Sequence, residues 1–246
     1  MLQSLRKRRP APTGTATEPD HRALAEVLAA VQVEGVAGLP ERRPNLDSYI
    51  TELAGVDPDS LSRNGALAYW LNLYNAGALH LAGDALAASE TSVLRVPGGF
   101  SRPIVSVGDE GLSLSDIEHG KVRRFKDPRI HSALVCGSAS CPTLRFEPYQ
   151  GLTLESQLDA QTRSFLAAGA AARRDDTLQL SRVFLWYGAD FVRPSRMPTF
   201  RPATRRQIGR ALRPWLSPEL RADAGKLKVV FQPYDWGLAC SITLPD

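Results

Sequence analysis

The chain has 246 residues, of which 43% are apolar and 23% charged, and its formal net charge is +4. This composition is that of a globular protein, and the length fits one large domain better than two. No run reaches the roughly 20 continuous apolar residues that a membrane-spanning helix needs, so we expect no membrane span.

The first 18 residues are polar, basic and rich in Pro and Thr, which predicts a disordered tail (1–18) before a single globular domain (19–246). The basic start is not followed by the apolar segment that a secretory signal requires. We therefore expect a cytoplasmic protein, unless a leader has been removed. Three cysteines do not make a disulfide framework, and in a reducing cytosol they should be thiols.

Apolar residues recur at helical spacing in three stretches of the N-terminal third: Pro19 to Val33, residues 45–54, and Ala66 to Gly83. The third stretch is apolar on nearly all sides, which indicates a helix in the middle of the fold. Asn72 and Asn75 within it need hydrogen-bond partners, because a buried amide without them is costly.

A hairpin is predicted next, with strands at 104–107 and 112–114 joined by a Gly-rich turn. Ser115 and Glu118 then match the spacing of a capping box, in which the acidic side chain binds the start of a helix. The sequence therefore predicts a short helix that begins at Ser115 and carries His119.

The run from Ile130 to Cys136 is continuously apolar, and a buried strand is its best interpretation. Hairpin and strand signals mixed with helices, without a βαβ repeat, predict an α+β (mixed α/β) fold. We expect a central, mainly antiparallel sheet packed on the long buried helix, possible layouts being papain-like or transglutaminase-like. The remaining predicted elements are a helix at 153–168, a strand at 178–185, helices at 203–215 and 217–223, and a last strand at 227–232.

Two basic stretches stand out, at 121–129 and 193–213. The second leads into apolar Ile208, Leu212 and Trp215 at helical spacing, which is typical of a helix with a solvated Arg face and a buried stripe. Nucleic-acid binding requires a sharper basic footprint than this, so we do not expect a nucleic-acid partner.

Residues that can carry chemistry concentrate between Glu118 and Cys141. Cys141 follows a loop of small residues just after the predicted strand, where functional groups are common. Gly137, Ser138 and Ser140 in that loop allow backbone N–H groups to approach a substrate, as in an anion or oxyanion site. Cys141 is therefore predicted to be the most reactive thiol.

The other two thiols are interpreted as unreactive. Cys136 should end a buried strand and Cys240 lies in an apolar segment, and low dielectric raises the pKa of a thiol. On a regular strand His131 and Cys136 would also face opposite sides.

A nucleophilic thiol needs a base, and His119 and His131 are the candidates. Glu118 adjoins His119 and is kept as a possible catalytic residue, although capping alone would explain it. Asn72, Asn75 and Asp235 are candidates for orienting a base or binding substrate if the fold brings them close. The same His and Cys residues have the ligand types that zinc takes, although their spacing is not that of a known zinc finger.

Several strings resemble one known family when taken together and in order. They are AYWLNLYNA, SLSDIEHG, DPRIHSALVCGSASCP, LESQLDAQTRSFL, SRVFLWYGADF and YDW. Over about residues 45–238 the chain resembles the domain of unknown function 547 family. The family commonly has an Asn shortly after the terminal YDW, whereas Gly237-Leu238-Ala239 follows here. The resemblance implies a fold and a residue set but no reaction.

Two functions of different classes stay open, and a third is a weaker alternative. The first is a cysteine-dependent hydrolase or acyltransferase acting on an amide or thioester of a small molecule or peptide. The second is a non-catalytic binding or scaffold domain whose His and Cys residues form a hydrogen-bonded core. The third is a structural zinc domain. The sequence indicates no cofactor, and it does not name the substrate.

Overall fold

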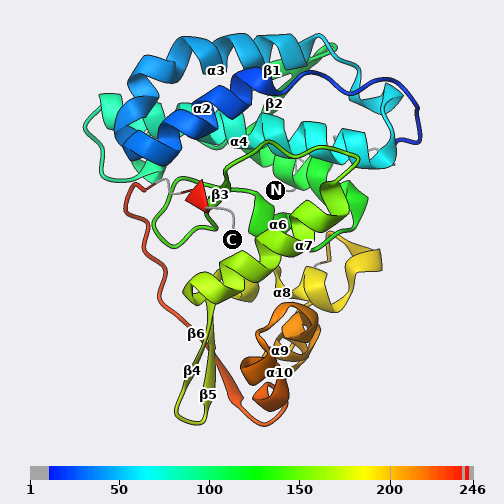
Figure 1. The fold of residues 1–246 in the computed structure, drawn as a ribbon, viewed down its shortest axis with the longest axis vertical. Coiled ribbons are helices and arrows are strands. Elements are labelled where there is room, and N and C mark those ends of the chain that lie inside the picture. Colours follow the sequence, from blue (N-terminus) through cyan, green and yellow to red (C-terminus); the bar gives the residue numbers. More distant parts are fainter. Residues whose placement is uncertain (1–10, 200, 240–241, 244–246) are drawn as a thin grey trace.

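The computed structural model describes residues 11–199, 201–239 and 242–243 (Figure 1). It is mainly helical with small sheets, so the predicted α+β class is confirmed. The helices are α2 (Arg22–Glu34), α3 (Leu39–Ala54), α4 (Arg63–Ala87), α5 (Leu114–Asp116), α6 (Ile130–Ala133), α7 (Leu154–Phe165), α8 (Val183–Val192), α9 (Arg205–Leu212) and α10 (Pro218–Asp223). The strands are β1 (Pro103–Val107), β2 (Glu110–Ser113), β3 (Leu144–Arg145), β4 (Ala171–Arg174), β5 (Thr177–Leu180), β6 (Lys228–Phe231) and β7 (Ile242–Thr243).

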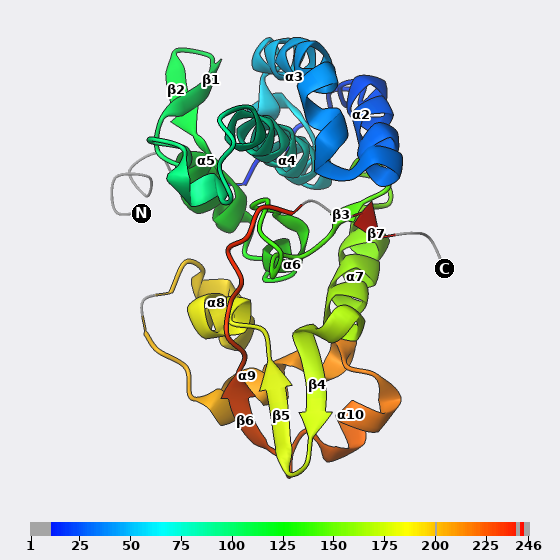
Figure 2. The same ribbon diagram turned by 90° about the vertical axis from the view of Figure 1, so that its left-hand side faces the viewer.

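The molecule has an upper and a lower part, each with its own hydrophobic core (Figure 2). Helices α2, α3 and α4 form most of the upper part, and α8, α9 and α10 surround the strands β4, β5 and β6 in the lower part. Helix α6 lies between the two parts, and α7 runs along one side from one to the other. The segment after β6 returns upward past α8 and α6, so that it joins the two parts a second time.

The central helix is α4, as predicted. Almost all of its side chains between Gly65 and Ala82 are buried. Asn72 and Asn75 have the partners that burial demands. The Asn72 amide donates to the Tyr149 carbonyl (2.8 Å) and its oxygen accepts from the Tyr149 N–H (2.9 Å). Each buried amide thus satisfies two backbone groups of a neighbouring segment.

Among the described residues, three small sheets take the place of the expected central sheet. β1 and β2 form the predicted antiparallel hairpin, β3 pairs in parallel with β7, and β5 pairs with β4 (antiparallel) and β6 (parallel). Helix α4 packs chiefly against α3, so helices rather than a sheet cover it. The strand expected at 178–185 ends at Leu180, because the apolar residues that follow form α8.

Helices α2 and α3 confirm the two expected N-terminal helices, although α3 begins at Leu39 instead of residue 45. By length and composition alone, the helical stretch Arg22–Ala54 is able to cross a membrane, and 33% of its most apolar window is buried. Gly35 interrupts this stretch with a φ of 62°. The expectation of no membrane span was based only on the absence of a long continuous apolar run. It stays a prediction.

Residues 11–18 lie against the domain, unlike the disordered tail expected for 1–18. The Ala16 N–H donates to the Ser60 carbonyl (3.1 Å), and the Glu18 carboxylate accepts from the Gly151 N–H (2.8 Å). Residues 1–10 lie outside the described residues.

The capping box lies two residues before the expected one. Ser113 is the N-cap of α5 and exchanges hydrogen bonds with Asp116, whereas Ser115 and Glu118 have no part in the cap. A π-helical turn, Ile117–Lys121, follows α5. π-turns often occur at functional sites, and this one carries His119. Capping therefore does not explain Glu118, whose carboxylate lies 3.7 Å from His119.

The predicted strand Ile130–Cys136 is wrong in its first half, where the structure has α6. The Asp127 carboxylate accepts from the Arg129 N–H (3.0 Å), which favours a helical turn at this point. The chain becomes extended at Leu134. Asn75 of α4 holds this change of direction, since it donates to the Ala133 carbonyl (3.0 Å) and accepts from the Val135 N–H (3.1 Å). His131 and Cys136 are therefore not related by strand alternation.

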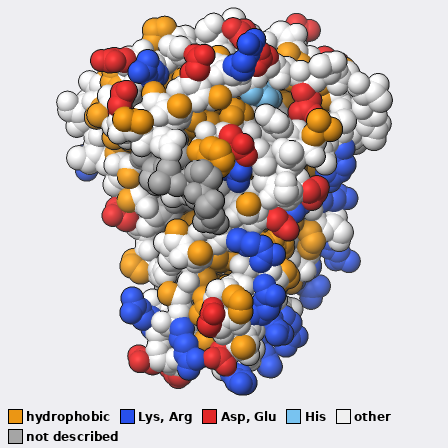
Figure 3. Space-filling model, in the orientation of Figure 1, with side chains coloured by type: hydrophobic (Ala, Val, Ile, Leu, Met, Phe, Trp, Pro, Cys, Tyr) orange, Lys and Arg blue, Asp and Glu red, His pale blue; other side chains and the backbone are white. Residues whose placement is uncertain are grey.

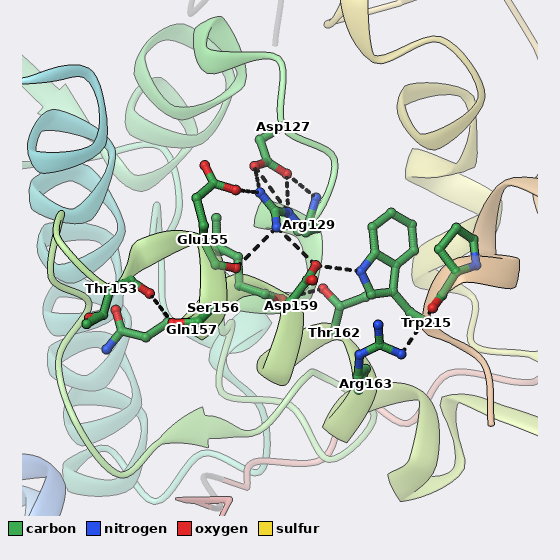
Figure 4. Close-up of polar contacts among 12 residues, drawn as sticks. Asp127, Arg129, Thr153, Glu155, Ser156, Gln157, Asp159, Thr162, Arg163 and Trp215 are labelled. Carbon is green, nitrogen blue, oxygen red and sulfur yellow. Dashed lines mark hydrogen bonds and ion pairs between the residues drawn. The ribbon is translucent and has the colours of Figure 1, made fainter. Parts of the chain in front are cut away.

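An ion-pair network fixes the start of α6 (Figure 4). The Arg129 guanidinium binds Asp127 (2.6 Å), Asp159 (3.0 Å) and Glu155. Asp159 also accepts from the indole N–H of Trp215 (2.8 Å), which belongs to the lower part of the molecule. The network thus connects α6, α7 and the segment after α9.

The two parts of the chain differ in charge. Residues 19–172 contain 13 Lys and Arg against 18 Asp and Glu, whereas residues 173–228 contain 13 Lys and Arg against five Asp and Glu. Lys and Arg side chains gather over the lower part of the face in Figure 3. Helix α9 confirms the predicted solvated Arg face, with Ile208 and Leu212 buried on its other side.

Candidate functional site

A cavity of about 430 Å³ lies where the upper and lower parts of the molecule meet. We call it the thiol cavity, because both Cys136 and Cys141 line it. Its other polar lining residues are Ser115, Glu118, His119 and His131. The structure therefore brings together the four residues predicted to be catalytic, Cys141, His119, His131 and Glu118.

The two thiols differ in their hydrogen bonds. The Cys136 sulfur lies 3.2 Å from the Ser138 hydroxyl and 3.4 Å from the Tyr234 hydroxyl. The Cys141 sulfur accepts from the Cys136 N–H (2.9 Å) and lies 4.0 Å from the Leu134 carbonyl. The Cys136 sulfur thus contacts two hydroxyl groups, whereas the shortest polar contact of the Cys141 sulfur is to a backbone N–H.

These contacts shift the pKa values of the two thiols in opposite directions. The pKa of Cys136 is lowered, because the Cys141 thiol and the Ser138 and Tyr234 hydroxyls stabilise its thiolate against the effect of burial. The pKa of Cys141 is raised by burial and by the neighbouring Cys136. Since the thiolate is the nucleophile, the geometry favours Cys136 over Cys141. Cys240 lies outside the described residues.

Two N–H groups of the loop 137–140 are paired away from the thiol cavity, so they are not free to form the expected oxyanion site. The Ala139 N–H donates to the Gly237 carbonyl (2.9 Å), and the Ser140 N–H to the Asp235 carbonyl (3.2 Å). The loop is thus paired with the C-terminal segment and does not line the thiol cavity. Gly137, with a φ of 81°, allows the chain to turn directly after Cys136.

The predicted substrate-binding residues have structural partners instead. The Ser140 hydroxyl accepts from the Asp235 N–H (2.9 Å), and the Asp235 carboxylate accepts from the Gly237 N–H (2.8 Å). The Ser138 hydroxyl binds the Cys136 sulfur. Asn72 and Asn75 are occupied by backbone groups and do not line the cavity.

His131 is oriented by a buried carboxylate. Its Nε2 lies 2.9 Å from the Asp190 carboxylate, and both side chains are 1% exposed. A carboxylate only accepts, so Nε2 of neutral His131 carries the proton and Nδ1 has the lone pair. Burial lowers the pKa of His131, although Asp190 opposes this effect. His131 is therefore neutral near pH 7 and able to accept a proton at Nδ1.

Asp190 has a second partner, which is cationic. Arg123, whose side chain is 4% exposed, donates to the Asp190 carboxylate through Nε (3.0 Å) and Nη2 (2.6 Å). The Thr199 N–H donates to the other carboxylate oxygen (3.2 Å). Although burial raises the pKa of Asp190, its bonds to His131 and Arg123 outweigh burial and lower it. Asp190 thus stays ionised.

His119 has the complementary geometry. Arg123 Nη1 lies 3.4 Å from His119 Nδ1, and because a guanidinium only donates, Nδ1 accepts and neutral His119 carries its proton on Nε2. The pKa of His119 is lowered by burial and by Arg123, although Glu118, 3.7 Å away, opposes this. His119 is thus a neutral N–H donor beside a carboxylate.

Aromatic rings surround these polar groups. Tyr187 stacks on His131, with ring centroids 4.0 Å apart, and burial together with the Glu118 carboxylate raises the pKa of its hydroxyl. Trp186, Tyr234 and Trp236 lie in mutual contact, with centroids 4.4 to 5.6 Å apart. All four rings line the thiol cavity.

Within the described residues, no group of three or more His, Cys, Asp or Glu side chains is placed to hold a metal ion. The His131 imidazole binds Asp190, and the His119 imidazole binds Arg123. The two thiols bind hydroxyl and backbone groups. The zinc interpretation therefore has no structural support here.

The sequence analysis missed Asp190 and Arg123. Asp190 is the only charged residue within the apolar string of α8, VFLWYGADFV, and a lone carboxylate in such a string was the available signal. Arg123 was noted only as a member of the basic stretch 121–129. Tyr187, Trp186, Tyr234 and Trp236 were not predicted as site residues, and Trp186 and Trp236 are partly exposed.

Residues 58–166 match the family model described as "Protein of unknown function, DUF547". The match covers less than half of the chain, and over this stretch it supports the resemblance to the DUF547 family. The matched stretch is shorter than the resemblance over residues 45–238. It contains Cys136, Cys141, His119, His131 and Glu118. Asp190 and the aromatic rings come from outside the DUF547 match. Searches of curated proteins and of solved structures gave no match.

We expect Asn75→Ala to destabilise the DUF547 region by about 2–4 kcal/mol, because two buried backbone groups lose their partner and each costs about 1–3 kcal/mol. These groups, on Ala133 and Val135, lie just before Cys136, so the variant should also change the alkylation rate of that thiol. Urea unfolding and iodoacetamide kinetics measure the two effects. Asn72→Ala is the matched control, and it should destabilise without changing the thiol. Equal effects of both variants on the thiol would contradict this assignment.

Proposed function

We propose that the thiol cavity is the active site of a cysteine-dependent hydrolase or acyltransferase acting on an amide or thioester, with Cys136 as the nucleophile. The supporting observation is that one cavity holds a thiol bonded to two hydroxyls and a histidine oriented by a buried carboxylate. Nucleophile, base and orienting group are the three parts of a catalytic triad, which is recognised by geometry. A reducing, cytoplasmic setting belongs to the proposal, because the thiols must stay reduced.

In the proposed reaction, His131 Nδ1 receives the proton of the Cys136 thiol, and the thiolate attacks the substrate carbonyl carbon. The new carbon–sulfur bond forms a tetrahedral intermediate. As it collapses, the bond to the amine or thiol leaving group breaks, and His131 returns its proton to that group. Water, or an acceptor amine or alcohol, then gives its proton to His131, attacks the thioester and releases Cys136.

The negative oxygen of the intermediate needs donors, and the paired N–H groups of the loop 137–140 are not free for this. His119 Nε2–H is the proposed donor, since Arg123 fixes its tautomer. Such a preorganised donor stabilises developing charge strongly in a site that excludes water.

A non-catalytic binding domain is the second candidate. It is favoured by one observation: among the described residues, the hydrogen bonds of both thiols go to hydroxyl, backbone and sulfur groups, and none goes to an imidazole. In this alternative the polar cluster only stabilises the cavity wall.

The rate of alkylation by iodoacetamide as a function of pH distinguishes the two candidates. We expect Cys136 to react at least tenfold faster than Cys141 at pH 7, with an apparent pKa below about 7.5, compared with about 8.5 for an ordinary thiol. The fast reaction should vanish in Cys136→Ser and persist in Cys141→Ser. With 4-nitrophenyl acetate, mass spectrometry should find the acetyl group on Cys136, and His131→Ala should slow its formation.

Cys141→Ser is the matched control, because a hydroxyl at this position still donates to Cys136. If both thiols react slowly with a pKa near about 8.5, and no acetyl adduct forms, the binding-domain candidate replaces the enzyme. A fast thiol at Cys141 would return the nucleophile to the residue that the sequence favoured.

A further inference from the structure

We infer that the thiol cavity accepts a hydrocarbon chain, so that the substrate is the amide or thioester of an aliphatic acid. This inference deepens the proposed function and rests on it. The cavity size of about 430 Å³ is within the usual range of ligand pockets, roughly 300–1,000 Å³.

The first support is the distribution of exposed apolar side chains. Six large hydrophobic residues are exposed in the described part of the chain, and three of them, Leu94, Trp186 and Trp236, line the thiol cavity. Leu185, also exposed, is next to Trp186 in α8. Exposed apolar groups that cluster at one place mark a site for an apolar partner.

The second support is the composition of the wall. Ten of the sixteen lining residues are aliphatic or aromatic, among them Phe100, Leu134, Pro142 and Val183. A hydrocarbon chain gains free energy from leaving water for such a surface. A ligand with many polar groups would lose its hydrogen bonds to water without replacement.

The third support is the state of the polar groups close to the nucleophile. A bound peptide would need backbone partners, yet the Ala139 and Ser140 N–H groups already donate to carbonyls of residues 235–237. His131 and Arg123 are engaged with Asp190. The Ala139 and Ser140 N–H groups are thus not available to bind the backbone of a peptide.

The test measures binding of neutral, unreactive analogues to the Cys136→Ser variant. Butanamide, hexanamide and octanamide are titrated while tryptophan fluorescence is followed, since Trp186 and Trp236 line the cavity. Affinity should rise about three- to fourfold for each added methylene group, the factor expected when a methylene is buried. Affinity that does not change with chain length would overturn the inference.

Two variants test where the hydrocarbon chain of the ligand binds. Trp186→Ala and Trp236→Ala should each weaken octanamide binding at least fivefold. Leu152→Ala, which removes an exposed apolar side chain (99% exposed) outside the cavity lining, is the matched control and should have no effect. If Leu152→Ala weakens binding as much as the Trp variants, the chain binds elsewhere and the inference fails.

The outcome is separable from that of the proposed function. A reactive Cys136 without chain-length dependence keeps the enzyme and rejects the aliphatic substrate. Chain-length dependence with an unreactive Cys136 keeps the hydrocarbon site and rejects the enzyme, in favour of a domain that binds aliphatic chains.

Discussion

Replacing Trp70 with alanine should lower the free energy of unfolding by about 3–5 kcal/mol, the usual cost of truncating a buried aromatic side chain. Trp70 is 2% exposed in the middle of α4. Its ring packs edge-on against Tyr69, with centroids 5.0 Å apart, and the Lys121 ammonium lies 5.8 Å from its centroid. Truncation would remove all these contacts and leave a cavity in the upper core. Urea unfolding measures the loss.

Trp70→Phe is the control for this prediction. The indole N–H is buried without a hydrogen-bond partner among the described residues, so phenylalanine removes a poorly placed donor while it keeps most of the ring. We expect it to cost less than half as much as alanine. A loss below about 1 kcal/mol for Trp70→Ala would mean that α4 does not lie in the core.

Local sequence patterns predicted the helices and strands in which the buried residues recur at one regular spacing. The stripe Leu24, Val27, Leu28 and Val31 gave α2 directly, and the all-round apolar composition of α4 identified the central helix. The hairpin β1–β2 followed from its turn. In each case the residues that decide the structure are neighbours in the chain, so periodicity and turn chemistry are sufficient.

The prediction of a strand at 130–136 failed because a short apolar run is compatible with a strand or a buried helical turn. The choice is made by Asn75, some 60 residues earlier, which holds the Ala133 carbonyl and the Val135 N–H. No local pattern contains that information. The choice of Cys141 as nucleophile depended on the same strand, because burial at its end was the reason for discounting Cys136.

The site itself depends on distant partners in the same way. Cys136 and Tyr234, 98 positions apart, form one contact, and His131 and Asp190, 59 positions apart, form another. The sequence supplied the right group of His, Cys and Glu residues near the cavity. It did not supply their pairing, since titration of each group depends on neighbours that only the fold brings close.

Replacing Asp190 with asparagine should lower the free energy of unfolding by about 3–5 kcal/mol, because it leaves the buried Arg123 guanidinium without its counter-charge. The pKa of Asp190 is lower in the folded state than its unfolded value of about 3.9, so its contribution is present above that pH and is lost in acid. The difference between wild type and variant should therefore shrink as the pH falls below about 4. Urea unfolding from pH 7 to pH 3 measures it.

The double variant Arg123→Leu with Asp190→Asn tests the cause. Removing both charges leaves no uncompensated ion, so we expect it to be more stable than Asp190→Asn alone. If it is less stable, packing and not charge determines the effect.

Asp190 is a positioning residue in the proposed reaction, and a second measurement separates this role from stability. An asparagine amide is able to donate to His131 Nε2 and so to move the imidazole proton to Nδ1, which abolishes the base. In a triad, the corresponding change lowers turnover by about 10⁴. We expect acetyl transfer from 4-nitrophenyl acetate to Cys136 to fall at least 100-fold in Asp190→Asn at a temperature where the variant is folded. Alkylation by iodoacetamide at pH 9 should change little, because there the thiolate forms without a base. If both reactions fall equally, Asp190 only holds the fold together, and His131 is not the base.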